Sequence, residues 1–354
     1  MRDVSFGQAA RWALIGGVAL ATTAAFGYVG GWLAPRRLTP QRLVDTLQRN
    51  AGLHAGYRRN HAKGVCVAGW FEGNGAAGAY STAAVFARVR TPVIGRFAIP
   101  GGNPYAPDGS VPIRSMALRF NLTDGQQWRT GMNAMPVFPV STPQAFYEQA
   151  LAGRRDPATG KPDPAKLAAF FAAHPETAAF RAWAKQARPS ASYATERYNS
   201  INAFYLVDAQ GQRRAVRWAM VPQANDARPG PVGDPDYLAR DLHRRLAQGP
   251  QRWTLRITIA APGDPVDDAA RAWPADRPGI DAGTLVIDRM QPQDSGACRD
   301  VNYDPTVLPT GIEPSADPLL AARSAAYANS YLRRTSEEAH LPGTRHPVPL
   351  ESAR

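Results

Sequence analysis

Cysteine is nearly absent from this chain, which has only Cys66 and Cys298 among its 354 residues. Two cysteines so far apart show neither the spacing of metal ligands nor a disulfide framework, which excludes a zinc module and a disulfide-rich scaffold. The sequence leaves two alternatives open for them. They form either a single bridge, made outside the cytoplasm, or two buried and unpaired thiols.

The sequence also lacks internal repeats, low-complexity blocks and any concentrated stripe of one charge. Lys and Arg number 41 against 29 Asp and Glu, which gives a formal net charge of +12 at pH 7. The basic residues are scattered rather than massed with interleaved aromatic residues, so nucleic acid is not expected as a partner. A scattered basic surface is typical of a solvated exterior, and it also suits an anionic membrane nearby.

Charge is missing from residues 12–33, a run rich in Ala, Gly, Val and Leu. The run is long enough to span a bilayer, so we expect a transmembrane anchor there, preceded by a cytoplasmic N-terminus at 1–11. A cleaved signal segment is the alternative, because small residues at 23–25 suit a signal peptidase. Arginines flank the run on both sides and leave its orientation ambiguous. We expect a single-pass inner-membrane protein with its main domain in the periplasm, or the same domain secreted to the periplasm after cleavage.

The chain does have enough apolar material for one large domain, since 44% of its residues are hydrophobic. We expect a linker at 34–42, this domain at 43–340 and a tail at 341–354, with a surface strap after Arg334. Strands are expected at 61–71, 83–90, 92–99, 114–122, 202–207, 215–221, 253–260 and 283–287, and helices at 41–50, 143–151 and 164–186. Many strands joined by turns such as Asp124-Gly125 predict an α+β fold, an antiparallel β-barrel with surrounding helices.

The first segment whose residues could take part in chemistry is the expected strand that begins near His61. Alternate residues of a strand face opposite sides, so Ala62, Gly64, Cys66 and Ala68 leave one face nearly bare. Small residues let a backbone lie close to something flat, and His61 beside it could act as an acid or base. Taken alone, a single histidine in a strand is more often structural.

A second segment is a helix expected to begin at Asp317, which suits the N-cap, and Pro318, which suits the first turn. Arg323, Tyr327 and Arg334 share one face of this helix. A tyrosine that binds iron(III) does so as a phenolate, and a guanidinium one turn earlier would stabilise that charge. Arg334 would then be available to a haem propionate. By itself, an Arg-x-x-x-Tyr helix is more often an ordinary surface or core helix.

A third segment, residues 131–138, places Asn133 beside an apolar run that contains Pro136. A neutral amide can hydrogen-bond a bound peroxide without competing for its proton. On its own, Asn133 is more typical of a turn.

In this order, these segments resemble the haem catalase superfamily, and within it the catalase-related peroxidases. The resemblance covers roughly residues 43–334. It includes Arg58-x-x-His61-Ala62-Lys63-Gly64, then Arg96-Phe97, residues 114–120, 133–138, 202–208 and 303–312, and the helix that carries Tyr327. The resemblance implies the fold, a b-type haem and the positions of the site residues.

The implied site has two catalytic residues, one iron ligand and five further cofactor-binding side chains. These are His61 and Asn133 on the distal side, Tyr327 as axial ligand, and Arg58, Arg96, Phe146, Arg323 and Arg334. By resemblance, three of the arginines would bind haem propionates, while Arg323 would pair with the axial phenolate. Phe146 would stack on the haem, although a core aromatic is an equal alternative there.

The chain departs from large catalases in ways that affect the expected activity. Arg59 and Asn60 stand where catalases usually carry apolar residues, and Ala98 stands where a serine would support the distal histidine. A wider, more polar approach and a less constrained His61 would weaken peroxide dismutation and admit organic donors. The arm and helical domain that interlock catalase tetramers have no counterpart, which favours a monomer or homodimer.

The expected function is therefore a haem-dependent peroxidase that reduces hydrogen peroxide or organic peroxides with a small organic electron donor. We expect weak catalase activity at most. Three alternatives stay open: a true catalase, a fatty-acid hydroperoxide converting enzyme, and a non-catalytic membrane haem-binding protein.

Overall fold

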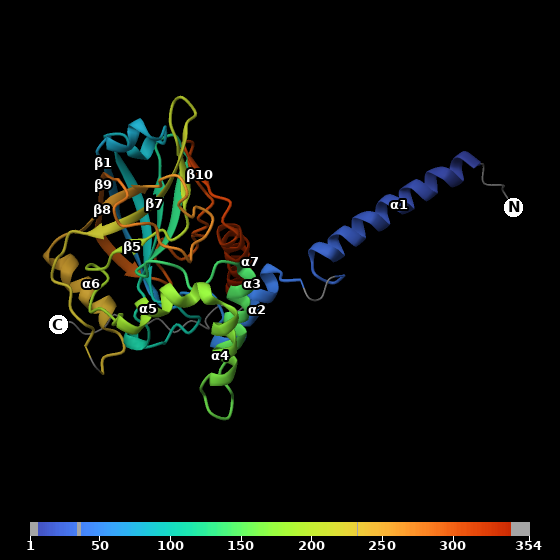
Figure 1. Cartoon of the computed structure of the whole chain (residues 1–354), viewed down its shortest axis with the longest axis horizontal. Coiled ribbons are helices and arrows are strands. Elements are labelled where there is room, and N and C mark those ends of the chain that lie inside the picture. The colour runs from blue at the N-terminus through green and yellow to red at the C-terminus, as the bar shows by residue number, and fades with distance from the viewer. Residues whose placement is uncertain (1–5, 34–36, 232, 341–354) are drawn as a thin grey trace.

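The structure is a computed structural model that describes residues 6–33, 37–231 and 233–340. In Figure 1 the strands form one body with helices packed on its flank, and helix α1 (Phe6–Val29) lies apart from that body. The stretch Gly7–Val29 is long and apolar enough to cross a membrane, and an N-terminal signal sequence has the same properties. The helix ends before the predicted limit of the span, because Gly30 and Gly31 follow, with Gly31 at φ +82°.

Within the described residues, a ten-stranded antiparallel sheet closes on itself where β7 pairs with β8. The closed part runs β7-β5-β4-β3-β2-β1-β9-β8, an eight-stranded barrel, and β6 and β10 extend it beside β7. The strands are β1 (Gly64–Gly73), β2 (Arg90–Ala98), β3 (Ser115–Asn121), β4 (Gln127–Asn133), β5 (Tyr198–Asn199), β6 (Phe204–Val207), β7 (Arg213–Pro222), β8 (Gln251–Ile259), β9 (Gly279–Pro292) and β10 (Ile312–Pro314). This topology confirms the predicted α+β fold with an antiparallel barrel.

Aromatic side chains fill the barrel interior. The rings of Phe120 and Trp128 stack with centroids 4.6 Å apart, and those of Phe204 and Trp218 stack at 4.2 Å. Buried and partly exposed residues alternate along β4, so its core residues face inward while Gly131 and Asn133 face the outer side. The outer face of β3 and β4 is therefore available for a site.

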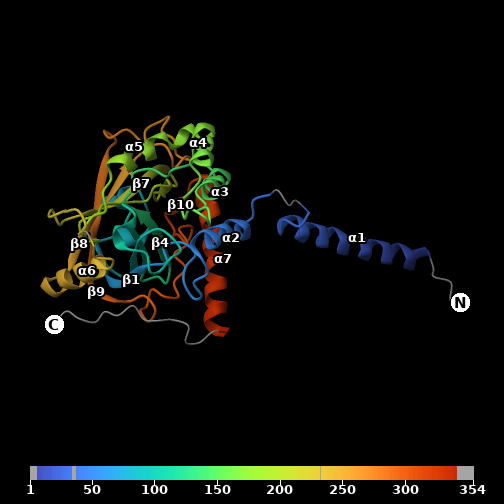
Figure 2. The same cartoon turned by 90° about the horizontal axis from the view of Figure 1, so that it is seen from below.

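Helices surround the barrel, and three of them, α2, α3 and α7, cover that outer face. The helices are α2 (Pro40–Ala51), α3 (Pro143–Ala152), α4 (Pro164–Ala173), α5 (Ala178–Gln186), α6 (Tyr237–Gln248) and α7 (Pro318–His340). Figures 1 and 2 show α2, α3 and α7 side by side on one flank of the barrel. Asp45 of α2 accepts from Arg333 of α7 at 2.6 Å, and Arg59 pairs with Glu337 further along α7. Ion pairs thus hold the first and last helices of the body together.

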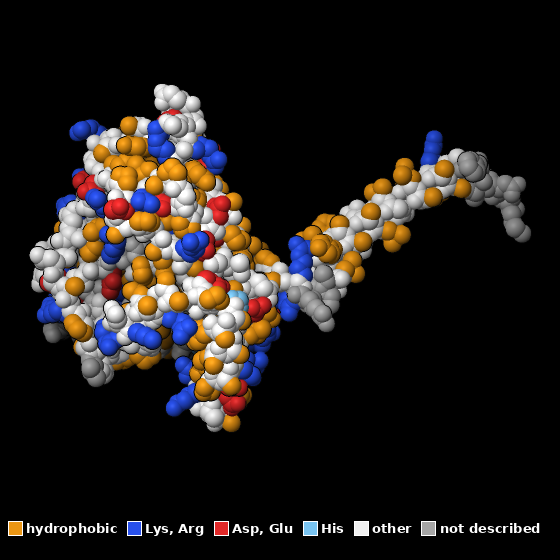
Figure 3. All heavy atoms as spheres, in the orientation of Figure 1, with side chains coloured by type: hydrophobic (Ala, Val, Ile, Leu, Met, Phe, Trp, Pro, Cys, Tyr) orange, Lys and Arg blue, Asp and Glu red, His pale blue; other side chains and the backbone are white. Residues whose placement is uncertain are grey.

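The surface carries mixed charge. In Figure 3 the Lys and Arg side chains of the visible face are spread among acidic and apolar ones, without a continuous basic patch. This face agrees with the scattered basic residues of the sequence.

The structure corrects three of the expected elements. Residues 83–90 form no strand before Arg90, because consecutive Val85 and Phe86 are both buried and a 3₁₀ turn at Ala84–Phe86 accommodates them. The helix expected at 164–186 is split at Pro175, since a proline disfavours helical backbone at the residue before it. α7 continues to His340, so the strap expected after Arg334 is wrong for residues 335–340. The tail expected at 341–354 lies outside the described residues.

Four of these strands and helices are absent from the sequence-based expectation: the strands β4, β5 and β10 and the helix α6. β5 and β10 are too short to leave a pattern, and β4 ends in Thr-Gly-Met-Asn, which is more typical of a turn. α6 has Leu238 and Leu242 at helical spacing, a local signal that does indicate a helix. The structure also decides between the two alternatives for the cysteines. Cys66 and Cys298 form a disulfide, with their Cα atoms 5.3 Å apart.

Candidate functional site

A cavity lies between the outer face of the barrel and the helices α2, α3 and α7. Its walls come from residues 58–61, the ends of β2, β3 and β4, the segment 301–303, and one face of α7. All eight site residues named from the sequence line it: Arg58, His61, Arg96, Asn133, Phe146, Arg323, Tyr327 and Arg334. The fold therefore gathers side chains up to 276 positions apart, from Arg58 to Arg334, around a single space.

The register of α7 follows from its first turn. The Asp317 carboxylate accepts from the backbone N–H of Leu319 at 2.9 Å, which is the N-cap interaction expected from the sequence. The Asp317 side chain is itself held by the Asn202 amide at 2.8 Å. With its start fixed, α7 turns Arg323, Tyr327 and Arg334 toward the cavity.

The guanidinium of Arg323 connects Tyr327 to the barrel. It donates to Gly131 O at 2.8 Å, to Asn202 Oδ1 at 2.5 Å and to Tyr327 Oη at 3.4 Å. A Cβ atom on Gly131 would lie 2.9 Å from the Arg323 Nη2 atom, so the glycine permits this close approach. The cation expected beside the Tyr327 phenol is thus present, and it is positioned by residues whose role the sequence did not show.

His61 does not stand on a strand as expected, because β1 begins only at Gly64. Its backbone is left-handed, with φ +56°, in a turn held by the Asn60 side chain. Asn60 Oδ1 accepts from the N–H of His61 at 2.9 Å and from that of Gly101 at 2.7 Å. The turn, rather than strand alternation, directs the imidazole into the cavity.

The imidazole of His61 is neutral. Burial, reinforced by the charges of Arg96, Arg323 and Arg58, lowers the pKa of His61 from 6.5 to about 3. Its partial exposure is to the cavity that it lines, and its Nδ1 atom has no hydrogen-bond partner among the described residues. A neutral imidazole can accept a proton from a bound molecule through its other ring nitrogen, Nε2, and return it.

Asn133 ends β4 and lines the same cavity as His61. The Ser115 hydroxyl donates to Asn133 Oδ1 at 2.6 Å across the β3–β4 pair. This bond fixes the oxygen end of the amide, so its NH₂ end is the donor left to interact with a ligand.

Three arginines lie close together in the cavity wall without a carboxylate among its lining residues. Arg58 donates to carbonyl oxygens, and Arg96 donates to Ala62 O at 3.2 Å and Gln293 Oε1 at 2.5 Å. Burial, with the charges of Arg96 and Arg334, lowers the pKa of Arg58, and burial lowers that of Arg96 to about 10. None of the described residues that line the cavity is acidic, although Asp300 lies 3.8 Å from Arg334 behind it. Such a cluster is suited to an anionic ligand.

Phe146 lines the cavity from α3, with its ring 5.5 Å from that of Phe138. It also packs beside a small apolar cluster that contains Val140, Ala145 and Phe170. The geometry is compatible with either expected role, core packing or stacking on a ligand.

Two wall residues differ from what the sequence predicts. Tyr303 has no predicted role, and Arg59 is expected to make the approach to the site more polar. Tyr303 is buried in the wall, burial raises its pKa to about 12, and its hydroxyl has no partner among the described residues. Tyr303 lay within a segment noted in the sequence, but nothing there showed that its hydroxyl would be enclosed. Arg59 lines the cavity, yet its guanidinium is engaged by Glu337 and by Gln48 at 2.9 Å, so it does not act as a free polar group in the approach.

These residues fit a haem. Tyr327 supplies a phenol oxygen with an adjacent cation, and the arginine cluster supplies countercharge for two carboxylates. Small side chains leave flat stretches of wall, at Ala98, Ala117, Gly131, Ala322 and Ala326. The donor set, the charge and the shape thus point to the same group.

Comparison with known proteins agrees with this geometry. A family model described as Catalase matches residues 30–351. A "Catalase-related peroxidase" of Synechococcus elongatus is 38% identical over 329 residues, 92% of this chain and 96% of that protein. A second, of Mycolicibacterium paratuberculosis, is 33% identical and covers 84% of this chain and 95% of that protein.

The fold also matches solved catalase structures. A bacterial catalase superposes with a TM-score of 0.70 at 21% identity, over 84% of this chain and 61% of that one. A fungal catalase gives a TM-score of 0.69 at 22% identity, over 80% and 61%. At these identities the likeness supports the fold alone, and this chain spans about three fifths of those structures.

The depressed pKa of His61 predicts acid sensitivity in the protein without added ligand. Between pH 6.5 and about 3, the unfolded chain binds a proton at His61 that the folded chain does not, so stability falls as the pH falls through this window. Asparagine tolerates left-handed backbone, so the variant His61→Asn keeps the turn. Between pH 7 and pH 3.5 its free energy of unfolding should fall less than that of the wild type, by on the order of 3 kcal/mol. Denaturant unfolding from pH 7 to pH 3.5 measures this, and parallel curves for the two proteins would contradict it.

Proposed function

Because the chain belongs to the catalase family, we propose that it is a haem peroxidase that reduces hydrogen peroxide or an organic peroxide with a small organic electron donor. One observation carries the proposal: a single cavity holds Tyr327 with its cation, a neutral His61 and an arginine cluster, with no acidic residue among the described residues that line it. The two relatives matched over nearly their whole length are named catalase-related peroxidases, which favours peroxidase over catalase activity.

In this proposal the chain holds a b-type haem by its iron and by its two carboxylates. Tyr327 ligates the iron as a phenolate, and the guanidinium of Arg323 stabilises that negative charge. Arg58, Arg96 and Arg334 receive the propionates, and the enclosed hydroxyl of Tyr303 is a further donor on this wall. When bound, haem supplies the redox chemistry of peroxide reduction.

The residues on the distal side orient the peroxide and transfer its proton. His61 is neutral at physiological pH, so it accepts the proton of one peroxide oxygen and returns it to the other. Asn133 orients the peroxide with its amide donor, while its oxygen stays bonded to Ser115. Two electrons and two protons from the donor complete the reduction of the peroxide to water, or to an alcohol and water.

We expect weak catalase activity at most, because the ring of His61 lacks a supporting hydrogen bond. The Nδ1 atom of His61 has no partner among the described residues, and the methyl group of Ala98 offers none from the facing wall. An imidazole without a second hydrogen bond is less firmly oriented, which disfavours a second peroxide as reductant. A carrier of haem without turnover would need only Tyr327 and the arginines, so the fixed amide of Asn133 argues against that alternative.

Localisation follows from α1 and from the disulfide. In this proposal α1 anchors the protein in the inner membrane, or acts as a signal segment, and the haem domain at 43–340 lies in the periplasm as a monomer or homodimer. The Cys66–Cys298 bond supports an oxidising compartment.

The variant His61→Asn tests the proton-transfer role. Asn keeps the left-handed turn, so haem should stay bound while peroxidase turnover with a chromogenic donor falls roughly 10²–10⁴-fold. His54→Asn is the matched control, because His54 does not line the cavity. Undiminished turnover in His61→Asn would refute the role assigned to this histidine.

The variant Tyr327→Phe tests the iron ligand. Removing the phenol oxygen should abolish the phenolate charge-transfer band and lower the haem content of the purified protein. Tyr331→Phe removes a hydroxyl one turn later on the same face of α7 and should leave the spectrum as in the wild type. If Tyr327→Phe keeps the wild-type haem content and spectrum, the ligand assignment is wrong.

A further inference from the structure

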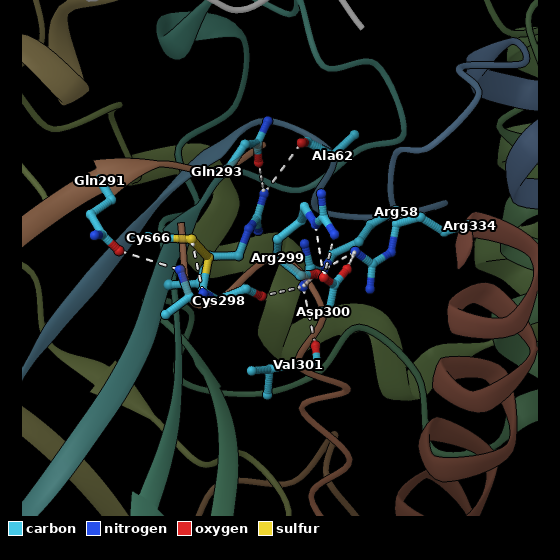
Figure 4. Close-up of a disulfide and its surroundings, with 12 residues drawn as sticks. Arg58, Ala62, Cys66, Gln291, Gln293, Cys298, Arg299, Asp300, Val301 and Arg334 are labelled. Atoms are coloured by element: carbon cyan, nitrogen blue, oxygen red, sulfur yellow. Dashed lines mark hydrogen bonds and ion pairs between the residues drawn. A yellow bond between two sulfur atoms is a disulfide. The ribbon is translucent and has the colours of Figure 1, made fainter. Parts of the chain in front are cut away.

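The Cys66–Cys298 disulfide joins a barrel strand to the segment that follows β9. Cys66 is the third residue of β1, and Figure 4 shows Arg58, Arg299, Asp300, Val301 and Arg334 around the bond. The bond links residues 232 positions apart, and both half-cystines are buried. It therefore ties a distant segment to the most regular part of the fold.

Backbone carbonyls of this segment hold two arginines of the cavity. The Nη2 atom of Arg58 donates to the carbonyl oxygens of residues 298, 299 and 301 at 3.0, 3.1 and 3.1 Å. Arg334 Nη1 donates to Arg299 O. The two side chains converge on the loop from the 58–61 turn and from α7, as Figure 4 shows.

The loop that carries these carbonyls, which we define as residues 298–301, has no helix or strand structure. Its backbone N–H groups make local turns, such as Arg299 N–H to Gly296 O at 2.9 Å, and a bond from Cys298 to Cys66 Sγ at 3.2 Å. Val301 also packs in a buried cluster with Cys66, against Ile94 and Ala117 of the barrel. The neighbouring bond from Arg129 to Asn302 O, at 2.7 Å, is made just beyond it. A loop with few backbone bonds to other elements is among the first parts of a protein to open. The disulfide is its covalent tie to the barrel, and it acts beside the packing of Val301.

Carbonyl oxygens are position-sensitive partners for a guanidinium. A carboxylate attracts an arginine over several ångströms, whereas a carbonyl dipole is effective only at hydrogen-bond distance and in the right direction. Since no acidic residue lines the described cavity, a shift of the loop would leave Arg58 without its oriented acceptors.

We infer that the Cys66–Cys298 disulfide is a positioning element for haem binding: it fixes the 298–301 loop, whose carbonyls aim Arg58 and Arg334 at the haem propionates. Opening the bond releases the loop, and the two arginines then bind the propionates less firmly. This inference rests on the proposed haem site. It assigns the disulfide a role in cofactor retention, beyond its general effect on the unfolded chain.

The test compares haem release from the full chain with and without the bond. The variant with Cys66→Ala and Cys298→Ala is loaded with haem, and transfer to an excess of a haem-scavenging protein is followed in the visible region. We expect release on the order of tenfold faster than in the wild type, because weaker charge-assisted bonds to a propionate lower the affinity. Release at the wild-type rate would overturn the inference.

A double-mutant cycle separates positioning from a general loss of stability. Arg58→Gln is combined with the cysteine replacements, and release is measured for all four proteins. If the disulfide acts through Arg58, the combined change is smaller than the product of the two separate changes. If the changes multiply, the bond acts elsewhere and the inference fails. Thermal unfolding of the haem-free proteins shows how much stability the bond contributes by itself.

A second route covers the case in which the cysteine variant does not fold. The bond is opened in the native, haem-loaded protein by a dithiol, which gives two electrons and two protons to the disulfide and closes to a cyclic disulfide itself. The two new thiols are then counted by alkylation. Faster release from the reduced protein supports the inference, and unchanged release overturns it. A wild-type protein that binds no haem would instead refute the proposed function.

Discussion

The buried positive charge of the cavity is the constraint on which the rest of the site depends. Arg58, Arg96 and Arg334 meet at one wall, and carbonyl and amide oxygens take the place of carboxylates on its lining. Burying cations in this way costs free energy, which shows in the lowered pKa values of Arg58 and Arg96. An anionic ligand offsets that cost. Burial, reinforced by the charges of Arg96, Arg323 and Arg58, lowers the pKa of His61 and keeps it neutral, so two arginines of the cluster also act on the proton-transfer residue.

The scaffold meets this constraint by fastening irregular segments to regular ones. α7 begins at a buried N-cap held by Asn202, and Arg323 joins the helix to Gly131 on the barrel. The turn that carries His61 is closed by the Asn60 amide, and the 298–301 loop is closed by a disulfide. In the last two cases a polar or covalent tie fixes a short stretch that has no strand or helix bonds of its own to hold it.

How far the sequence predicts the structure depends on whether the relevant contacts are local. The register of α7 can be predicted because Asp317 and Pro318 mark its start and 3.6-residue periodicity places the rest. Strands β2, β3 and β8 lie close to the ranges expected from their runs of strand-forming residues. The left-handed turn at His61, the buried Tyr303 hydroxyl and the pairing of Cys66 with Cys298 depend on neighbours distant in sequence. The break at Pro175, by contrast, is encoded locally by the proline itself.

The visible spectrum and turnover of the haem-loaded protein test the central claim most directly. Hydrogen peroxide is added to the purified protein with and without a chromogenic donor, and both donor oxidation and oxygen release are followed. The account predicts a high-spin ferric phenolate spectrum, donor oxidation and little oxygen. Rapid oxygen release without a donor would make the protein a catalase in function, and a protein that takes up no haem would contradict the account altogether.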